Sequence, residues 1–179
     1  MSAGITQKVI SFRSHPLTRP HYADGMSQMS PNTITDVFSM ARIAEQRPLT
    51  GDELEQLNNA SAGLNRTLGL RYVEVGPERV VSELRVTANH LQPAGLVNGG
   101  VYCAIAESTG STAGIIFGRG KPVVGVNNNT DFIASVRDGV IRAEATAIQK
   151  GGRTQVWQIL CTHNGELVAR TTLRTMVLG

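Results

Sequence analysis

The sequence contains few of the residues that mark several common protein classes. Aromatic residues make up only 4% of its 179 residues, so the core is predicted to consist of aliphatic and small side chains. The two cysteines, Cys103 and Cys161, lie far apart and lack the spacing of a zinc or redox motif. We therefore predict two buried free thiols, no metal site and no redox cofactor.

Long apolar runs and strongly charged segments are also missing. Nowhere do about 18 apolar residues follow one another, as a membrane-spanning helix requires, and the first thirty residues lack the apolar stretch of a signal peptide. Seventeen Lys and Arg against 14 Asp and Glu give a net charge of +3 without a long basic run. The sequence predicts a cytoplasmic protein that binds neither membrane nor nucleic acid. Its modest positive charge suits a small anionic ligand.

The length of the chain suits one domain with a tail. Residues 1–30 are polar and interrupted by proline and glycine, which predicts the tail, and the segment after them has the apolar spacing of a helix. Thr50, with Glu53 three residues later, predicts the capping box of a second short helix. We divide the chain into residues 1–48, a tail with an accessory helix, and residues 49–179, the main domain.

The main domain combines strand-like runs with one long helical segment. Residues 68–75 and 79–87 predict a hairpin, and the small and apolar segment 99–117 predicts a long helix with Asn98 as its cap. Four strand-like runs follow, at residues 123–133, 140–150, 153–163 and 167–178. They are joined by three short sequences that predict hairpin turns: Arg137-Asp138-Gly139, Gly151-Gly152 and Asn164-Gly165.

This order of elements predicts an α+β fold. Two strands, one buried helix and four strands in an antiparallel meander fit a single long central helix wrapped by a curved antiparallel sheet of about six strands. The segment before residue 49 adds helical structure outside this core.

Glu107 is the only charged residue between Leu91 and Gly118, and it lies near the middle of the helix that is expected to be most buried. An ionised carboxylate in an apolar setting costs several kcal/mol. Its presence therefore indicates acid–base chemistry or nucleophilic attack. The alternative is a helix on the surface that presents Glu107 to solvent, but the neighbouring residues supply no charged outer face.

Gly99 and Gly100 begin the same helix. The free N–H groups of a helix N-terminus and the positive end of its dipole suit a developing oxyanion, and glycine lets a carbonyl group approach closely. A simple glycine-rich helix start is the alternative. Gly99 and Glu107 are separated by about 12 Å along the helix axis, so they cannot both contact one carbonyl group. If they act together, two antiparallel copies of the helix must supply them, which predicts a homodimer with two composite sites.

The stretch from Asn98 to Gly114, NGGVYCAIAESTGSTAG, resembles the helix motif of the hot-dog-fold acyl-CoA thioesterases. It resembles in particular the PaaI-like branch with the enterobactin-pathway proofreading, 1,4-dihydroxy-2-naphthoyl-CoA and glutamate-dependent 4-hydroxybenzoyl-CoA thioesterases. The similarity continues through residues 123–132 and 152–159 and covers about residues 64–179. It implies the hot-dog fold and hydrolysis of an acyl-CoA or aroyl-CoA thioester to free acid and CoA.

The resemblance also implies a role for each matching position. Glu107 is the nucleophile or the general base, and the Gly99 N–H is the oxyanion donor. Gln92 lies where the family keeps a Gln or Asn near the thioester, and Ser111, one turn after Glu107, positions water or the acyl group. The alternatives are an ordinary loop residue for Gln92 and a packing hydroxyl for Ser111. No cofactor is implied, because coenzyme A enters as part of the substrate.

The turn Gly152-Arg153-Thr154 resembles the family segment beside the phosphates or pantetheine arm of CoA, and Gly100 is implied to bind CoA with it. Guanidinium and backbone donors suit these anionic groups. The alternative is a hairpin corner with a solvated arginine. The implied partners are an acyl-CoA and further copies of the chain, in a homodimer or tetramer.

Asn98 departs from the family motif, which has histidine at this position. Asparagine can donate a hydrogen bond to the thioester oxygen and cap the helix, but it cannot carry a proton near neutral pH. A non-catalytic acyl-CoA-binding or regulatory hot-dog module is therefore the rival hypothesis. A hydratase is disfavoured because hot-dog hydratases use a His/Asp pair and this helix contains no histidine. The sequence leaves open the acyl group and the choice between CoA and acyl-carrier protein.

Overall fold

The computed structural model describes residues 31–178. The helices are α2 (Pro31–Gln46), α3 (Gly51–Asn59), α4 (Gly63–Leu68), the 3₁₀ turn η1 (Ala88–His90) and α5 (Gly99–Phe117). The strands are β1 (Arg71–Val75), β2 (Arg79–Arg85), β3 (Val123–Phe132), β4 (Val140–Lys150), β5 (Thr154–His163) and β6 (Glu166–Val177).

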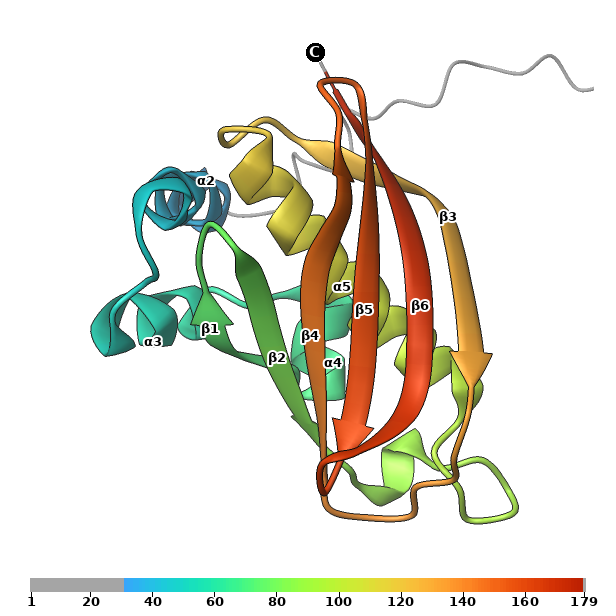
Figure 1. Ribbon diagram of the computed structural model, residues 1–179. Coiled ribbons are helices and arrows are strands. Elements are labelled where there is room, and N and C mark those ends of the chain that lie inside the picture. The colour runs from blue at the N-terminus through green and yellow to red at the C-terminus, as the bar shows by residue number, and fades with distance from the viewer. Residues whose placement is uncertain (1–30, 179) are drawn as a thin grey trace, which may run out of the picture. The chain divides into compact units, whose positions relative to one another are not determined.

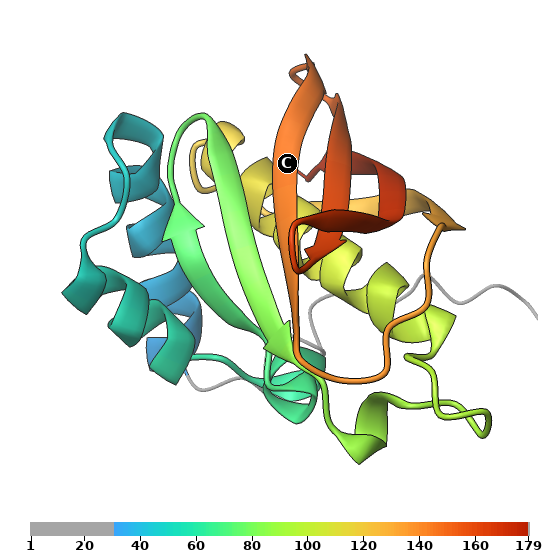
Figure 2. The ribbon, with the colours of Figure 1, turned by 60° about the horizontal axis from the view of Figure 1, so that its bottom comes forward.

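The strands form one antiparallel sheet in the order β1-β2-β4-β5-β6-β3. The sheet curves around α5, which contacts every strand from β2 to β6 (Figure 1). Figure 2 shows α5 lying between the β1–β2 hairpin on one side and β3 on the other. This arrangement confirms the predicted hot-dog fold.

One connection differs from the prediction. The turn at residues 137–139 was predicted to join two neighbouring strands of a meander, but β3 pairs with β6 and not with β4. β4 has no free edge for β3, because β2 pairs along one side of it and β5 along the other. Residues 133–139 are therefore a crossover, held by hydrogen bonds from the backbone N–H of Val97 to the carbonyl of Val136 and from that of Val86 to the carbonyl of Gly139.

The other two predicted hairpin turns are confirmed. Gly151 and Gly152 join β4 to β5, and Asn164 and Gly165 join β5 to β6. Asn164 and Gly165 have φ angles of 51° and 84°. A type I′ turn requires positive φ at both central residues, which an Asn-Gly pair adopts readily.

The small residues of α5 let it pack closely on the sheet. A Cβ atom on Gly110 would lie 2.5 Å from Leu173 Cδ2 and 3.1 Å from Ile159 Cδ1, so only glycine fits. The buried hydroxyl groups at this contact are paired, as shown by the 2.6 Å hydrogen bond between Ser82 Oγ and Thr109 Oγ1. The small side chains of α5 therefore permit its close packing on the sheet.

The helices before β1 pack on the same core. Ala41 and Ala44 of α2 are buried in it. The capping box predicted for α3 is present, because Thr50 and Glu53 each bond the backbone N–H of the other. The domain boundary at residue 48 stays a prediction, and the predicted tail, residues 1–30, lies outside the described residues.

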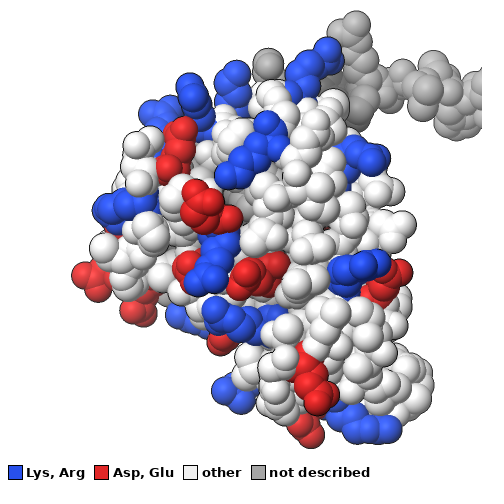
Figure 3. All heavy atoms as spheres, viewed as in Figure 1, with Lys and Arg blue, Asp and Glu red and all other residues white. Residues whose placement is uncertain are grey.

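The outer face of the sheet carries charges of both signs, with Lys and Arg lying among Asp and Glu (Figure 3). Several of them form ion pairs, such as Arg142 with Glu83 at 2.9 Å. In the described part of the chain, no helix is both long and apolar enough to cross a membrane. The cytoplasmic location stays a prediction.

Both cysteines are free thiols. Cys161 is buried and Cys103 is half-buried. Burial, with a smaller contribution from Cys103, raises the pKa of the Cys161 thiol to about 12, which keeps it protonated near neutral pH. Among residues 37–178, whose side chains the structure describes, no three His, Cys, Asp or Glu are grouped so that they could hold a metal ion.

Candidate active site

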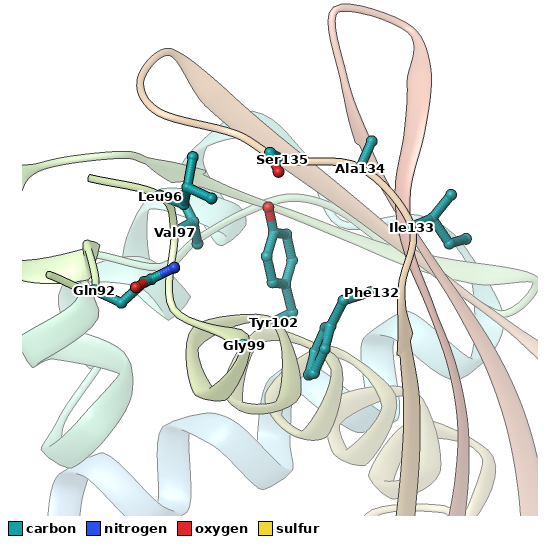
Figure 4. Close-up of a pocket in the computed structure, with 9 residues that line it drawn as sticks. All are labelled: Gln92, Leu96, Val97, Gly99, Tyr102, Phe132, Ile133, Ala134 and Ser135. Atoms are coloured by element: carbon teal, nitrogen blue, oxygen red, sulfur yellow. The ribbon is translucent and has the colours of Figure 1, made fainter. Parts of the chain in front are cut away.

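A pocket with a volume of about 260 Å³ lies beside the N-terminus of α5. Its walls come from the loop before α5, the first turn of the helix and the segment around the end of β3 (Figure 4). The lining residues are Gln92, Leu96, Val97, Gly99, Tyr102, Phe132, Ile133, Ala134 and Ser135. Two of the predicted site residues, Gln92 and Gly99, therefore share one pocket.

The N-terminus of α5 has the predicted cap and a free donor. Asn98 Oδ1 accepts a hydrogen bond from the Gly100 N–H at 2.8 Å. The Gly99 N–H is one of the first-turn donors that a helix leaves without an intrahelical partner, and no hydrogen bond among residues 31–178 uses it. A Cβ on Gly99 would lie only 2.7 Å from Phe132 Cζ, so glycine also makes room for that ring.

Gln92 presents an amide nitrogen to the same pocket. Its Oε1 accepts a hydrogen bond from the Ala94 N–H at 3.2 Å, which fixes the oxygen on the side of the loop. The side-chain nitrogen therefore points toward the pocket, as Figure 4 shows. An amide N–H here can donate to a ligand oxygen near the Gly99 N–H.

Glu107 lies further along α5 and faces β3. The side chain is half-buried, and its Oε2 accepts a hydrogen bond from Asn128 Nδ2 at 3.1 Å. The same nitrogen donates to the Cys103 carbonyl at 3.0 Å, so Asn128 is fixed from two sides. A Cβ on Gly125 of β3 would overlap the Glu107 carboxylate, so a side chain there would displace that carboxylate. No donor among the described residues bonds Oε1 of Glu107.

The predicted residues thus form two groups along α5. Gln92, Asn98, Gly99 and Gly100 lie at its N-terminus, and Glu107 lies about 12 Å along the axis from Gly99. Ser111, half-buried, follows Glu107 by one turn. A single chain does not bring the oxyanion donor and the carboxylate to one point.

A second pocket, also of about 260 Å³, lies at the other end of α5. Three cationic side chains line it together with Gly152: Arg119, Lys121 and Lys150. Lys150 Nζ also lies 5.3 Å from the centre of the Phe117 ring. The other two residues of the predicted CoA segment, Arg153 and Thr154, follow Gly152 in the sequence and are exposed. The pocket concentrates positive charge beside the β4–β5 turn.

Sequence reasoning missed Asn128 and the three cationic residues of the second pocket. Asn128 is the middle residue of three consecutive asparagines within β3, and asparagine is depleted in strands. That run was a usable signal. The cationic residues come from separate segments, so only the fold reveals that they lie together.

Comparisons with known proteins identify the family of this chain. Residues 94–169 match the model of the thioesterase superfamily. The 1,4-dihydroxy-2-naphthoyl-CoA hydrolase of Escherichia coli K12 is 34% identical over 128 residues, which cover 70% of this chain and 94% of that one. The proofreading thioesterase EntH of Cronobacter turicensis is 33% identical over 129 residues and also covers 70% of this chain and 94% of its own.

The solved structure of the Mycobacterium tuberculosis protein Rv1847/MT1895 is also similar. It is 39% identical in sequence, with a TM-score of 0.62, and the alignment covers 64% of this chain and 94% of that one. A long helix wrapped by a six-stranded antiparallel sheet defines a hot-dog protein. The chain belongs to the thioesterase superfamily, and the predicted class, a thioester hydrolase, is confirmed.

Proposed function

We propose that this protein hydrolyses an acyl-CoA or aroyl-CoA thioester to the free carboxylic acid and CoA, with Glu107 as the catalytic carboxylate. The position of Glu107 carries the proposal. It is the one charged side chain of α5, it is half-buried against β3, and Asn128 holds one of its two oxygens. The other oxygen is free to attack a carbonyl carbon or to take a proton from water.

The site requires two copies of the chain, because Gly99 and Glu107 of one chain lie too far apart. Among residues 31–178, β3 ends the sheet and has no strand partner on its outer edge. Exposed apolar side chains lie within β3 and directly after it. Val126 and Phe132 of the strand are 50% and 58% exposed, and the following residue, Ile133, is 52% exposed. Such an edge favours strand pairing with a second chain.

Antiparallel pairing of two β3 edges would also place the two α5 helices antiparallel. Gly99 of one chain would then approach Glu107 of the partner subunit, which gives two equivalent composite sites in a homodimer. Pairing of two such dimers gives the tetramer. In this arrangement the pocket at Gly99 holds the acyl group, and the partner's Glu107 closes it.

The chemistry follows from these positions. Glu107 either attacks the carbonyl carbon and expels CoA as its thiolate, leaving an anhydride that water hydrolyses, or removes a proton from the water that attacks. In both cases the thioester oxygen becomes negatively charged. The Gly99 N–H donates to that oxygen together with the amide of Gln92 or Asn98, which stabilises the transition state. Ser111 positions the water or the acyl group.

In this proposal CoA binds along the α5 helix that supplies Glu107, toward the C-terminal end of that helix. From Glu107 to Gly118 the distance along the helix axis is about 16 Å, which the extended pantetheine arm can bridge. Gly100 and the Gly152-Arg153-Thr154 turn contact the CoA moiety. The positive charge of Arg119, Lys121 and Lys150 suits its phosphates. The reaction uses no metal and no redox cofactor.

Asn98 favours one rival, an acyl-CoA-binding or regulatory module without turnover, because asparagine replaces the histidine of the family motif and cannot carry a proton near neutral pH. Release of free CoA from benzoyl-CoA and from a medium-chain acyl-CoA, followed with a thiol reagent, separates the two. We expect kcat on the order of 1–10³ s⁻¹ with the better substrate. Tight binding of both compounds without CoA release above the spontaneous rate would support the rival instead.

A further inference from the structure

A chain of hydrogen bonds connects the Glu107 carboxylate to the interior of the sheet. Asn128 Nδ2 donates to Glu107 Oε2 at 3.1 Å and to the Cys103 carbonyl at 3.0 Å. On the other side of the amide, Asn128 Oδ1 accepts a hydrogen bond from Thr130 Oγ1 at 2.8 Å. Thr130 Oγ1 in turn lies 2.8 Å from Thr171 Oγ1. Three polar side chains therefore link the carboxylate to β6.

The fold places these side chains in line. β3 and β6 are neighbours in the sheet (Figure 1), and Thr130 lies directly opposite Thr171 in their register. Asn128 and Thr130 are two residues apart on β3, so their side chains share one face of the strand. Thr171 is fully buried, whereas Asn128 and Thr130 are half-buried. The chain is therefore anchored in the core at one end and reaches Glu107 at the other.

The partners fix the direction of each hydrogen bond. A backbone carbonyl can only accept, so the side-chain atom of Asn128 that faces the Cys103 carbonyl must be the amide nitrogen. The amide oxygen then faces Thr130, whose hydroxyl donates its only proton to it. The Thr171 hydroxyl must therefore donate to Thr130. All the donors point the same way, from β6 toward the carboxylate.

This direction distinguishes the two oxygens of Glu107. The Asn128 nitrogen can only donate, so Oε2 must accept. An amide rotated by 180° would put its oxygen against both the Cys103 carbonyl and the carboxylate. It would also leave acceptors in this half-buried place without donors, which is unfavourable. The orientation seen in the structure therefore holds Oε2 and leaves Oε1 for chemistry.

We propose that Asn128 is a positioning residue, oriented by Thr130 and Thr171, which holds Glu107 Oε2 and thereby makes Oε1 the reacting oxygen. Oε1 is then the atom that attacks the thioester carbonyl or takes the proton from water. This inference rests on the proposed function, because it takes Glu107 as the catalytic carboxylate. The two asparagines that flank Asn128 in the sequence are exposed, so only the middle one of the three has this role.

The first test replaces Asn128 and measures kcat and KM with the better substrate of benzoyl-CoA and a medium-chain acyl-CoA. Asn128→Leu keeps the size of the side chain and removes the donor. It should lower kcat by about 10²-fold, the effect of a reacting group displaced by about 1 Å, with little change in KM. Asn128→Asp is closer in shape but turns an acceptor toward Glu107, so its loss should be at least as large. Asn129→Asp, on the exposed face of β3, is the matched control and should keep kcat close to that of the wild type.

The second test asks whether Thr130 acts through Asn128. Thr130→Val removes the hydroxyl that orients the amide and should lower kcat by about tenfold, roughly the value of one hydrogen bond. Thr130→Ser keeps the hydroxyl and should restore most of the activity. In the Asn128→Leu background, Thr130→Val should cause little further loss, because the two residues act through one contact. Thr172→Val, on the exposed face of β6, is the control for the lost hydroxyl.

Folding of each variant is checked by thermal unfolding and by its mass in light scattering. Unchanged kcat in Asn128→Leu and Thr130→Val, with activity lost in Glu107→Gln, would overturn this inference and leave the proposed function intact. Fully multiplicative losses in the double variant would also overturn it. If Asn128→Leu does not fold, the two Thr130 variants decide, and equal kcat in Thr130→Val and Thr130→Ser refutes the role of the hydroxyl. Absence of wild-type turnover with both substrates would overturn the proposed function and this inference with it.

Discussion

Glu107→Gln should lower kcat for an aroyl-CoA by about 10²–10⁴-fold, the range associated with a positioned acid–base group. Glutamine preserves the size of the side chain and an oxygen that can accept the 3.1 Å hydrogen bond from Asn128. It removes only the charge, so the fold should persist. KM should change little, because the groups proposed to bind CoA lie toward the C-terminal end of α5. Steady-state CoA release gives both constants.

Glu144→Gln is the matched control for this substitution. It also removes one carboxylate, but from a strand position whose side chain pairs with Arg79 at 3.7 Å and is 40% exposed. Its kcat should stay close to that of the wild type. An unchanged kcat in Glu107→Gln would remove Glu107 from the chemistry.

Gly99→Pro should lower kcat by about 10²–10³-fold, because it deletes the backbone N–H assigned to the oxyanion. The backbone at this position accepts proline, although its Cβ must displace the Phe132 ring. Gly99 is the first residue of α5, where proline is favoured and removes no intrahelical hydrogen bond. The preceding residue, Asn98, has φ of −64° and ψ of 136°, which suits a residue before proline.

Gly99→Ala is the control that isolates the N–H group. Alanine adds the same Cβ, which must displace the Phe132 ring lying 2.7 Å from that position, but it keeps the donor. Gly99→Ala should therefore retain much more activity than Gly99→Pro. Equal losses in the two variants would show that the contact with Phe132, and not the N–H, explains the effect.

Much of the fold was predictable from local sequence. The small and apolar run of α5, its Asn98 cap and the Asn164-Gly165 turn each encode their structure within a few residues. The partner of β3 was not predictable in this way, because it depends on which strand edges remain free once β4 has paired on both sides. The short helix α4 was missed, and residue 68 was assigned to a strand, because six residues give too few turns for a helical period to show.

The residues of the candidate site likewise divide into those that the local sequence reveals and those that depend on the fold. Glu107 stood out because it is the one charge on an apolar helix, and Gly99 because it begins that helix. Asn128 was missed although the run of three asparagines was a usable signal, because its role lies in a contact across the fold. Asn128 matters because it reaches the carboxylate from β3.

A composite catalytic site is tested most directly by the activity of dimers formed from two inactive variants. One subunit carries Glu107→Gln with Gly99 intact, and the other carries Gly99→Pro with Glu107 intact. If Gly99 acts with Glu107 of the partner subunit, each mixed dimer contains one fully wild-type site and one that lacks both groups. Equal co-expression with random pairing should therefore restore about a quarter of the wild-type CoA release. CoA release that stays at the average of the two separate variants, in a preparation shown to contain mixed dimers, would contradict the shared site.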